Sequence, residues 1–389
     1  MALVPQHPYD RCTQALRFHF LRWFNCGSRN VRPEHSLLNQ SAERLLELLD
    51  ELPGPLVLLG DSLLRDFFMT VACTLWNQNI LLVPPRAMKD SDWGRRGVTR
   101  LRRDYHGRTI MSYVWWRPVS QHGPQELNEL REAGLILTNL GLTHAHNQSE
   151  AYAWIDEFRS WTQHEQRLLH GRGEASATKH FQRVMTLAHP HMSHSEIELE
   201  HKRRRPHVLP MLALHETLPT HFPSTDDGEY DLEKQGKFES RAIRRTCAAH
   251  RAYPSQVREA NWRNAMTSEL ARTMSLPIVR FWEPLATRDN DHKTPSDIAL
   301  APIVRRGDPA MDCRHWCNPG ISTIQWSNET LPNFLRDTIL PRLLLNRWLA
   351  RRQMERERRR RRTLRCSNVS GDLRASVGCT PVGGLEDSV

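Results

Sequence analysis

Residues 56–66 read LVLLGDSLLRD, and this stretch decides the fold. Leu56–Leu59 are wholly apolar, which is typical of a strand buried on both faces of a parallel sheet. Gly60 and Asp61 then turn the chain, and a helix is expected from Ser62 to about Trp76. This order places Ser62 at the carboxyl edge of the sheet, where open α/β sheets bind their ligands.

Short apolar runs and amphipathic segments alternate through the rest of the chain. The predicted strands are residues 109–116, 135–139, 207–215 and 277–281. The predicted helices are residues 41–52, 124–133, 148–187 (in two pieces, broken near 171–173), 255–274 and 331–360. Strands that alternate with helices predict an α/β fold, here a three-layer sandwich with a mainly parallel sheet.

The 389 residues suffice for one large domain or two ordinary ones. We interpret residues 1–50 as an irregular N-terminal segment that ends in a helix, and residues 51–350 as the catalytic domain. Residues 222–246 are charged and poor in hydrophobic side chains, which indicates a loop insertion. Residues 351–389 are predicted to be an arginine-rich helix end followed by a disordered tail.

The net charge of +10 is concentrated at one end of the chain. Residues 351–365 hold nine arginines and two glutamates, a net of +7, and the rest is near neutral. A nucleic-acid partner is therefore not expected, because a binding groove needs a broad basic face. The arginine run is interpreted as a solvated helix end or arm. A role at an anionic membrane surface or with an acidic polysaccharide is an alternative.

No run of about 18 or more apolar residues is present, so no transmembrane segment is predicted. The start, Met1–Pro5, does not read as a signal peptide. Either the protein is cytosolic or a targeting segment lies upstream. Eight scattered cysteines lack the paired CxxC spacing of a zinc ribbon. Four Asn-x-Ser/Thr sequons favour a luminal or secreted protein: Asn39, Asn147, Asn328 and Asn368.

Two separate segments carry the residues of a nucleophilic site. Ser62 is expected at a helix N-terminus, where backbone N–H groups can stabilise an oxyanion. The alternative is an ordinary N-cap serine. Residues 312–320 read DCRHWCNPG, in which Asp312 and His315 can face one site from a single loop. Asp312 would orient the imidazole while its other nitrogen accepts the serine proton. The alternative is a chance pair on a surface turn.

The GDSLLRD and DCRHWCNPG segments together resemble the PC-esterase domain of the trichome-birefringence-like proteins, which are polysaccharide O-acetyltransferases with SGNH/GDSL-type folds. The resemblance spans residues 54–345, and weaker similarities follow in the same order at residues 70–76, 112–118, 137–141 and 218–222, and at Cys247. The chain departs from the family at Asp66, where asparagine is usual, and in the charged residues 223–246. The family's N-terminal anchor is also absent. These departures concern the acceptor and the compartment more than the chemistry.

The resemblance implies an SGNH-type serine enzyme in which Ser62 is the nucleophile, His315 the general base and then acid, and Asp312 the orienting carboxylate. It assigns the following residues to the oxyanion hole and substrate binding: Asn139, Gly141, Asp61 and Arg65. For Arg65 the alternative is a solvated position on the helix face. No metal or bound cofactor is expected, since the acyl donor is a co-substrate.

The resemblance also bears on the cysteines and the compartment. Cys313 and Cys317 flank His315, and Cys73 and Cys247 are their natural disulfide partners by resemblance, with the connectivity left open. The resemblance implies a location in the secretory pathway, in the Golgi lumen. In the cytosol these four residues would be free thiols.

The expected function is O-acyl transfer, in particular acetyl transfer, to hydroxyl groups of a polysaccharide or glycan through a serine acyl-enzyme. One alternative is an esterase that uses the same triad, and another is an inactive glycan-binding protein with the same fold. The oligomeric state stays open.

Histidines and tryptophans offer two further interpretations. The histidine-rich stretches around residues 144–146 and 189–201 look like loops, so a metal site is disfavoured. Five tryptophans are candidates for stacking on sugar rings: Trp93, Trp115, Trp116, Trp316 and Trp326. Strand alternation requires that either Trp115 or Trp116 belong to the core.

Overall fold

The computed structural model describes the following residues: 35–77, 98–102, 108–142, 145, 147–171, 210–221, 243–244, 261–287, 292–293, 311–316, 325–346, 348–349, 352 and 355–356. The chain divides into two compact units, residues 1–339 and 340–389. Each unit is described by itself below. The predictions for residues 1–34, 172–209, 222–242 and 357–389 lie outside the described parts of the chain.

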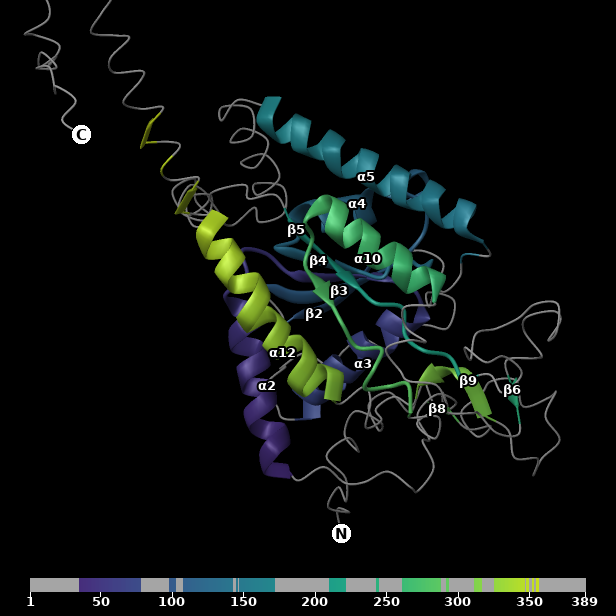
Figure 1. Cartoon of the computed structure of the whole chain (residues 1–389). Helices are drawn as coiled ribbons and strands as arrows, with labels where there is room; N and C mark the ends of the chain where they lie inside the picture. Colours follow the sequence, from purple (N-terminus) through teal and green to yellow (C-terminus); the bar gives the residue numbers. More distant parts are fainter. Residues whose placement is uncertain are drawn as a thin grey trace, which may run out of the picture. The chain divides into compact units, whose positions relative to one another are not determined.

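A six-stranded sheet in the order β2-β3-β1-β4-β5-β7 forms the centre of the first unit (Figure 1). Its strands are β2 (Val98–Arg102), β3 (Thr109–Trp115), β1 (Leu56–Gly60), β4 (Leu135–Thr138), β5 (Met211–His215) and β7 (Ile278–Val279). Only β2, at one edge, runs antiparallel to its neighbour, so the mainly parallel sheet is confirmed. The parallel strands follow the doubly wound order 2-1-3-4-5.

Strand β1 lies in the middle of this sheet because its whole sequence is apolar. It pairs in parallel with β3 on one side and with β4 on the other, and all five of its residues are buried. The chain passes from β1 to β3 and then returns past β1 to β4. The change of direction creates a switch point at the carboxyl ends of β1 and β4, the position at which doubly wound sheets bind ligands.

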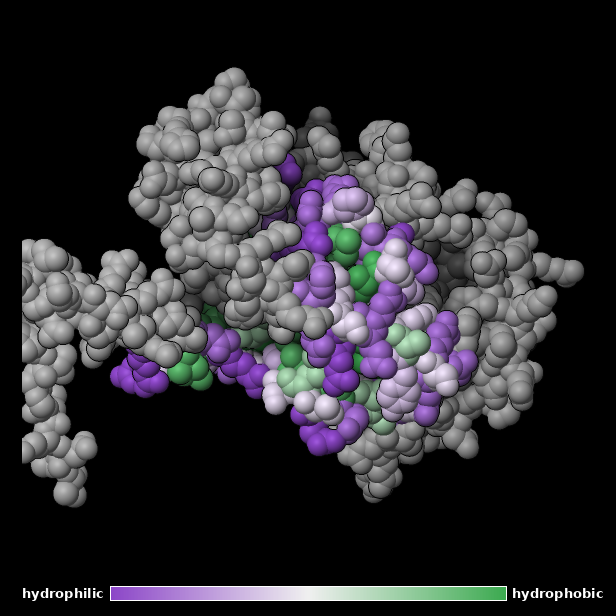
Figure 2. Space-filling model, turned by 90° about the horizontal axis from the view of Figure 1, so that it is seen from above, coloured by the Kyte–Doolittle hydropathy of each residue, from purple (hydrophilic) through white to green (hydrophobic). Residues whose placement is uncertain are grey.

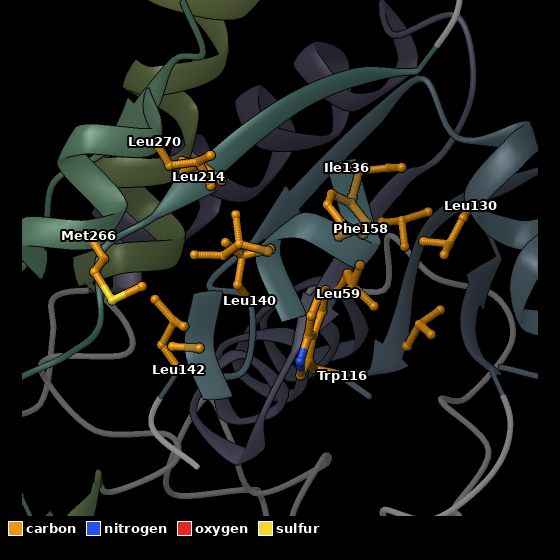
Figure 3. Close-up of a cluster of buried hydrophobic side chains, with 14 of the residues drawn as sticks. Leu59, Trp116, Leu130, Ile136, Leu140, Leu142, Phe158, Leu214, Met266 and Leu270 are labelled. Carbon is orange, nitrogen blue, oxygen red and sulfur yellow. The ribbon is translucent and has the colours of Figure 1, made fainter. Parts of the chain in front are cut away.

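Helices cover both faces of the sheet. On one face α4 (Pro124–Glu132), α5 (Gln148–Gly171) and α10 (Trp262–Met274) form a buried cluster with alternate strand residues (Figure 3). Val57 and Leu59 of β1 belong to this cluster. On the other face α3 (Ser62–Asn77) packs on β1 and β3, and α2 (His35–Asp50) packs on α3. Seen from above, the described surface is mainly hydrophilic, with small separate hydrophobic areas (Figure 2).

The end of the first unit differs from the uniform helix predicted for residues 331–360. Two π-helical turns, η7 (Trp326–Thr330) and η8 (Leu335–Ile339), flank the short α-helix α12 (Leu331–Phe334). In the second unit, residues 340–346 continue in helical conformation. Among the described residues, no helix is both long enough and apolar enough to cross a bilayer.

A second, smaller sheet was not predicted. Strand β9 (Met311–Trp316) lies between β6 (Ile243–Arg244) and β8 (His292–Lys293), and both pairings are antiparallel. The expectation that Asp312 and His315 belong to a loop is therefore wrong, because both lie on β9. The sequence around them is polar and rich in cysteine, with no alternating pattern that would indicate a strand.

Candidate active site at the carboxyl edge of the sheet

The turn from β1 into α3 holds Ser62 as the first residue of the helix. The side-chain Oδ1 of Asp61 accepts a hydrogen bond of 3.0 Å from the backbone N–H of Leu63. This is the bond that an N-cap residue makes to the first turn of its helix. Asp61 therefore caps α3, and the interpretation of Ser62 as an ordinary N-cap serine is wrong. Ser62 itself is buried, with 5% of its surface exposed.

Tyr113 of β3 holds this turn from the neighbouring strand. Its hydroxyl donates to the carbonyl oxygens of both Gly60 and Asp61, each at 3.0 Å. Burial raises the pKa of Tyr113 well above its ordinary value, so the phenol stays protonated and remains a donor. The backbone immediately before Ser62 is thus fixed by a side chain that the sequence gave no reason to single out.

Removal of the Tyr113 hydroxyl should destabilise the protein measurably. Tyr113→Phe leaves two buried carbonyl oxygens without this donor, which costs about 1–2 kcal/mol of unfolding free energy. Urea unfolding measures the change, and Tyr152→Phe, on the exposed tyrosine of α5, is the matched control. Equal unfolding free energies for the two variants would show that the Tyr113 contact contributes nothing.

A tight turn follows β4, the other neighbour of β1. The N–H of Leu142 bonds to the carbonyl of Asn139 at 3.3 Å, which closes the turn. Its two central residues, Leu140 and Gly141, have φ values of 56° and 61°. Positive φ is routine for glycine but strained for leucine. Strain of this kind persists where the surroundings over-determine the backbone, and it clusters at functional sites.

The same turn fixes the side chain of Asn139, which is only 3% exposed. Its Oδ1 accepts the backbone N–H of Gly141 at 3.1 Å, which leaves Nδ2 as the donor end of the amide. A Cβ placed on Gly60 would lie 2.8 Å from the same Oδ1, so Asn139 approaches β1 closely just before the Ser62 turn. The two predicted turns therefore lie side by side. Gly141 packs instead against Trp116.

Strand β9, which carries Asp312 and His315, lies against α3 (Figure 1). In a regular strand, residues three apart lie on opposite faces. The pairing of β9 with β8 is irregular in this interval, because His292 stands opposite Trp316 while its neighbour Lys293 stands opposite Asp312. Such irregularities re-aim side chains and are frequent beside active sites.

The side chains of both β9 residues lie outside the described part of the chain, and the same holds for the four candidate disulfide residues, Cys73, Cys247, Cys313 and Cys317. The triad and the disulfides therefore stay predictions. The histidine-rich stretches at 189–201 and at His144 and His146 also lie outside the described residues.

Arg65 lies one turn after Ser62 and is not solvated. Its side chain is 12% exposed, and its Nη2 atom lies 3.7 Å from Oδ1 of the buried Asp66. The alternative of a solvated helix-face arginine is therefore wrong. Asp66, where the resembling family usually has asparagine, supplies a carboxylate next to this buried guanidinium.

His215, the last residue of β5, was not predicted. Its Nε2 accepts the indole N–H of Trp326 at 2.9 Å, and Nδ1 lies 2.6 Å from the carbonyl oxygen of Glu216. An indole nitrogen only donates, so the proton must be on Nδ1. Burial lowers the pKa of His215 to about 4. Both ring nitrogens are thus engaged in a neutral ring, which makes His215 a structural residue rather than a general base.

Acid should destabilise the protein through His215. Between the ordinary pKa and about 4, the unfolded chain binds a proton that the folded chain does not. The unfolding free energy should therefore fall as the pH is lowered through this interval, by about 3 kcal/mol from this group alone. Urea unfolding from pH 7 to 4 measures the slope. His215→Gln should flatten the slope, and His164→Gln, at an exposed position of α5, should leave it unchanged.

The tryptophans divide as strand alternation requires. Trp116 is 5% exposed and belongs to the core cluster, whereas Trp115 is half-buried. Trp326 is fully buried and stacks on Phe67 at 4.4 Å between ring centroids. Trp93 and the side chain of Trp316 lie outside the described residues. Of the five candidates for sugar stacking, Trp115 is thus the one that the described structure leaves accessible.

Compared with known proteins, the sequence matches no protein-family model and no curated protein. The class that the structure defines is an α/β protein with a mainly parallel, doubly wound sheet. Folds of this class carry many unrelated activities, so the chemistry has to be argued from the site.

Proposed function

We propose that this protein is a serine-dependent O-acyltransferase with an SGNH-type sandwich, which moves an acetyl group to a hydroxyl of a polysaccharide or glycan. The observation that carries the proposal is the pair of turns at the switch point. The Ser62 turn is capped by Asp61 and held by Tyr113, and the strained Asn139 turn lies directly beside it.

In the proposed first half-reaction, His315 removes the proton of Ser62 while the Oγ atom attacks the acyl carbon of the donor. The resulting oxyanion accepts hydrogen bonds from the backbone N–H at the start of α3 and from Nδ2 of Asn139. His315 then returns the proton to the leaving group. In the second half-reaction His315 deprotonates a sugar hydroxyl, which attacks the acyl-enzyme and releases Ser62.

Two features support these roles. Asn139 needs no rearrangement to donate, because its Oδ1 is already occupied by the Gly141 N–H. Donors fixed in advance in a buried site stabilise developing charge more than mobile ones do. The packing of β9 against α3, with the irregular pairing after Asp312, is compatible with an approach of His315 to the serine.

A fluorophosphonate probe tests the nucleophile. Such probes react with activated serines, and the adduct can be located by peptide mass spectrometry. We expect one adduct, on Ser62, and we expect unfolded protein to remain unlabelled. A folded protein that takes up no probe would contradict the proposal and favour the glycan-binding alternative.

The acceptor is tested separately with an activated acetyl ester. Incubation with a panel of neutral and acidic oligosaccharides should give O-acetylated sugar, detected by a mass increase of one acetyl group. If free acetate is released at the same rate in the absence of sugar and with each sugar of the panel, the protein is an esterase and not a transferase. Ser62 would keep its role in that case.

A further inference from the structure

The helical segment at the start of the second unit exposes a stripe of large hydrophobic side chains. Residues 340–346 and 348–349 are helical. Four of their side chains are 48–63% exposed: Leu344, Leu345, Trp348 and Leu349. Their spacing of one and four residues places them along one side of a helix. Among the described residues, the other large hydrophobic side chain with comparable exposure is Tyr152 of the first unit.

Almost all of the net charge of the protein belongs to the sequence that contains and follows this stripe. Residues 340–365 contain eleven arginines and two glutamates, a net of +9 out of +10 for the whole chain. Arg342, Arg352 and Arg356 are exposed. The guanidinium of Arg352 lies 4.3 Å from the centre of the Trp348 ring, so cationic and aromatic groups are in direct contact at the end of the stripe.

We propose that this segment, residues 340–356, is a peripheral anchor that lies in the interface of an anionic lipid bilayer. Leucine and tryptophan on one side, with arginines alongside them, is the combination that interfacial helices use. The hydrophobic side chains enter the boundary between headgroups and acyl chains, and the arginines remain among the anionic headgroups.

Other binding partners of the hydrophobic stripe and its arginines fit the observations less well. An acidic polysaccharide or a nucleic acid would neutralise the arginines but would leave the hydrophobic stripe in water. A second copy of the chain would bury the stripe, yet it would bring two segments of +9 together. Of these binding partners, the anionic bilayer satisfies both the hydrophobic and the cationic components.

Vesicle flotation of the full chain tests the proposal. We expect at least tenfold stronger partitioning to vesicles of phosphatidylcholine with about 30% phosphatidylserine than to phosphatidylcholine alone at about 0.1 M salt. The double variant Leu345→Gln and Leu349→Gln keeps every charge and should lose at least about tenfold in partitioning. Tyr152→Gln, which removes an equally exposed hydrophobic group from the first unit, is the control and should bind as the wild type does.

The charge component is tested by a second pair of variants. Arg352→Gln with Arg356→Gln should reduce the preference for anionic vesicles, and Arg272→Gln, at an exposed position of α10, should not. Partitioning that is unaffected by the leucine variant would overturn the proposal, because charge alone would then explain it. Binding to RNA or dextran sulfate without binding to vesicles would overturn it as well. A wild-type dimer that dissociates in the leucine variant would also overturn the proposal, because the stripe would then bind a second copy of the chain.

Discussion

Replacement of Ser62 by alanine should lower the rate of acyl transfer at least about 10³-fold, since no other group in a serine mechanism can form the acyl-enzyme. Fluorophosphonate labelling should disappear as well. The unfolding free energy should change by no more than about 1 kcal/mol, because the capping bond of α3 belongs to Asp61 and not to Ser62. Acetyl transfer and urea unfolding, measured on the same preparation, separate the two effects.

Ser327→Ala provides the matched control. Ser327 is buried like Ser62, and its hydroxyl donates a hydrogen bond to Oδ1 of Asn328 at 3.1 Å. This variant should keep its labelling and its transfer rate. The double variant Ser62→Ala and His315→Ala should transfer acetyl groups no more slowly than Ser62→Ala. Once the nucleophile is gone, the base has no proton to remove, so its loss lowers the rate no further. Substantial activity in Ser62→Ala would refute the acyl-enzyme mechanism outright.

The largest loss of stability is expected for Gly141→Ala. A Cβ at this position would lie 2.0 Å from Cδ1 of the buried Trp116, and the backbone φ of +61° is unfavourable for any residue with a side chain. Steric overlap and strain together should lower the unfolding free energy by about 3 kcal/mol or more. Transfer activity should fall too, since the displaced turn also orients Asn139.

Gly123→Ala is the comparison for this prediction. The nearest atom to its added Cβ lies 3.9 Å away, and its φ is −74°, which alanine adopts readily. As the residue that caps α4 it should lose no more than about 1 kcal/mol. Urea unfolding compares the two glycines directly. Similar unfolding free energies for both alanine variants would mean that the turn after β4 relaxes without cost.

The sheet was predictable because its strands carry strong local signals. Leu56–Leu59 and residues 135–138 are short runs of almost uniform hydrophobicity, each followed by a turn, and such runs are typical of a buried parallel strand. The assignment of Asn139 to the site came from the family resemblance. The structure pairs β1 with β4, and the carboxyl ends of neighbouring parallel strands meet at one edge. The small sheet around β9 was missed, since β6 and β8 have two residues each and their pairing partners are distant in sequence.

The contacts that support the site were beyond prediction for a similar reason. His215 and Trp326 are 111 positions apart in the sequence. The residues on either side of each show no pattern that would predict the hydrogen bond between them. The burial of Arg65 depends on tertiary packing that helix periodicity does not specify. Periodic patterns report the local element, whereas a single polar contact between elements leaves no trace in either segment.

The position of Tyr113 couples the turn before Ser62 to the correct assembly of the sheet. Tyr113 stands opposite Leu58 in the pairing of β3 with β1, and from there its hydroxyl reaches the carbonyls of Gly60 and Asp61. A slip of one residue between these strands would send the phenol to the opposite face. A misassembled chain would then lack the contact that fixes the turn before Ser62. On the proposed mechanism, an ordered nucleophile would therefore exist only in the correctly paired sheet.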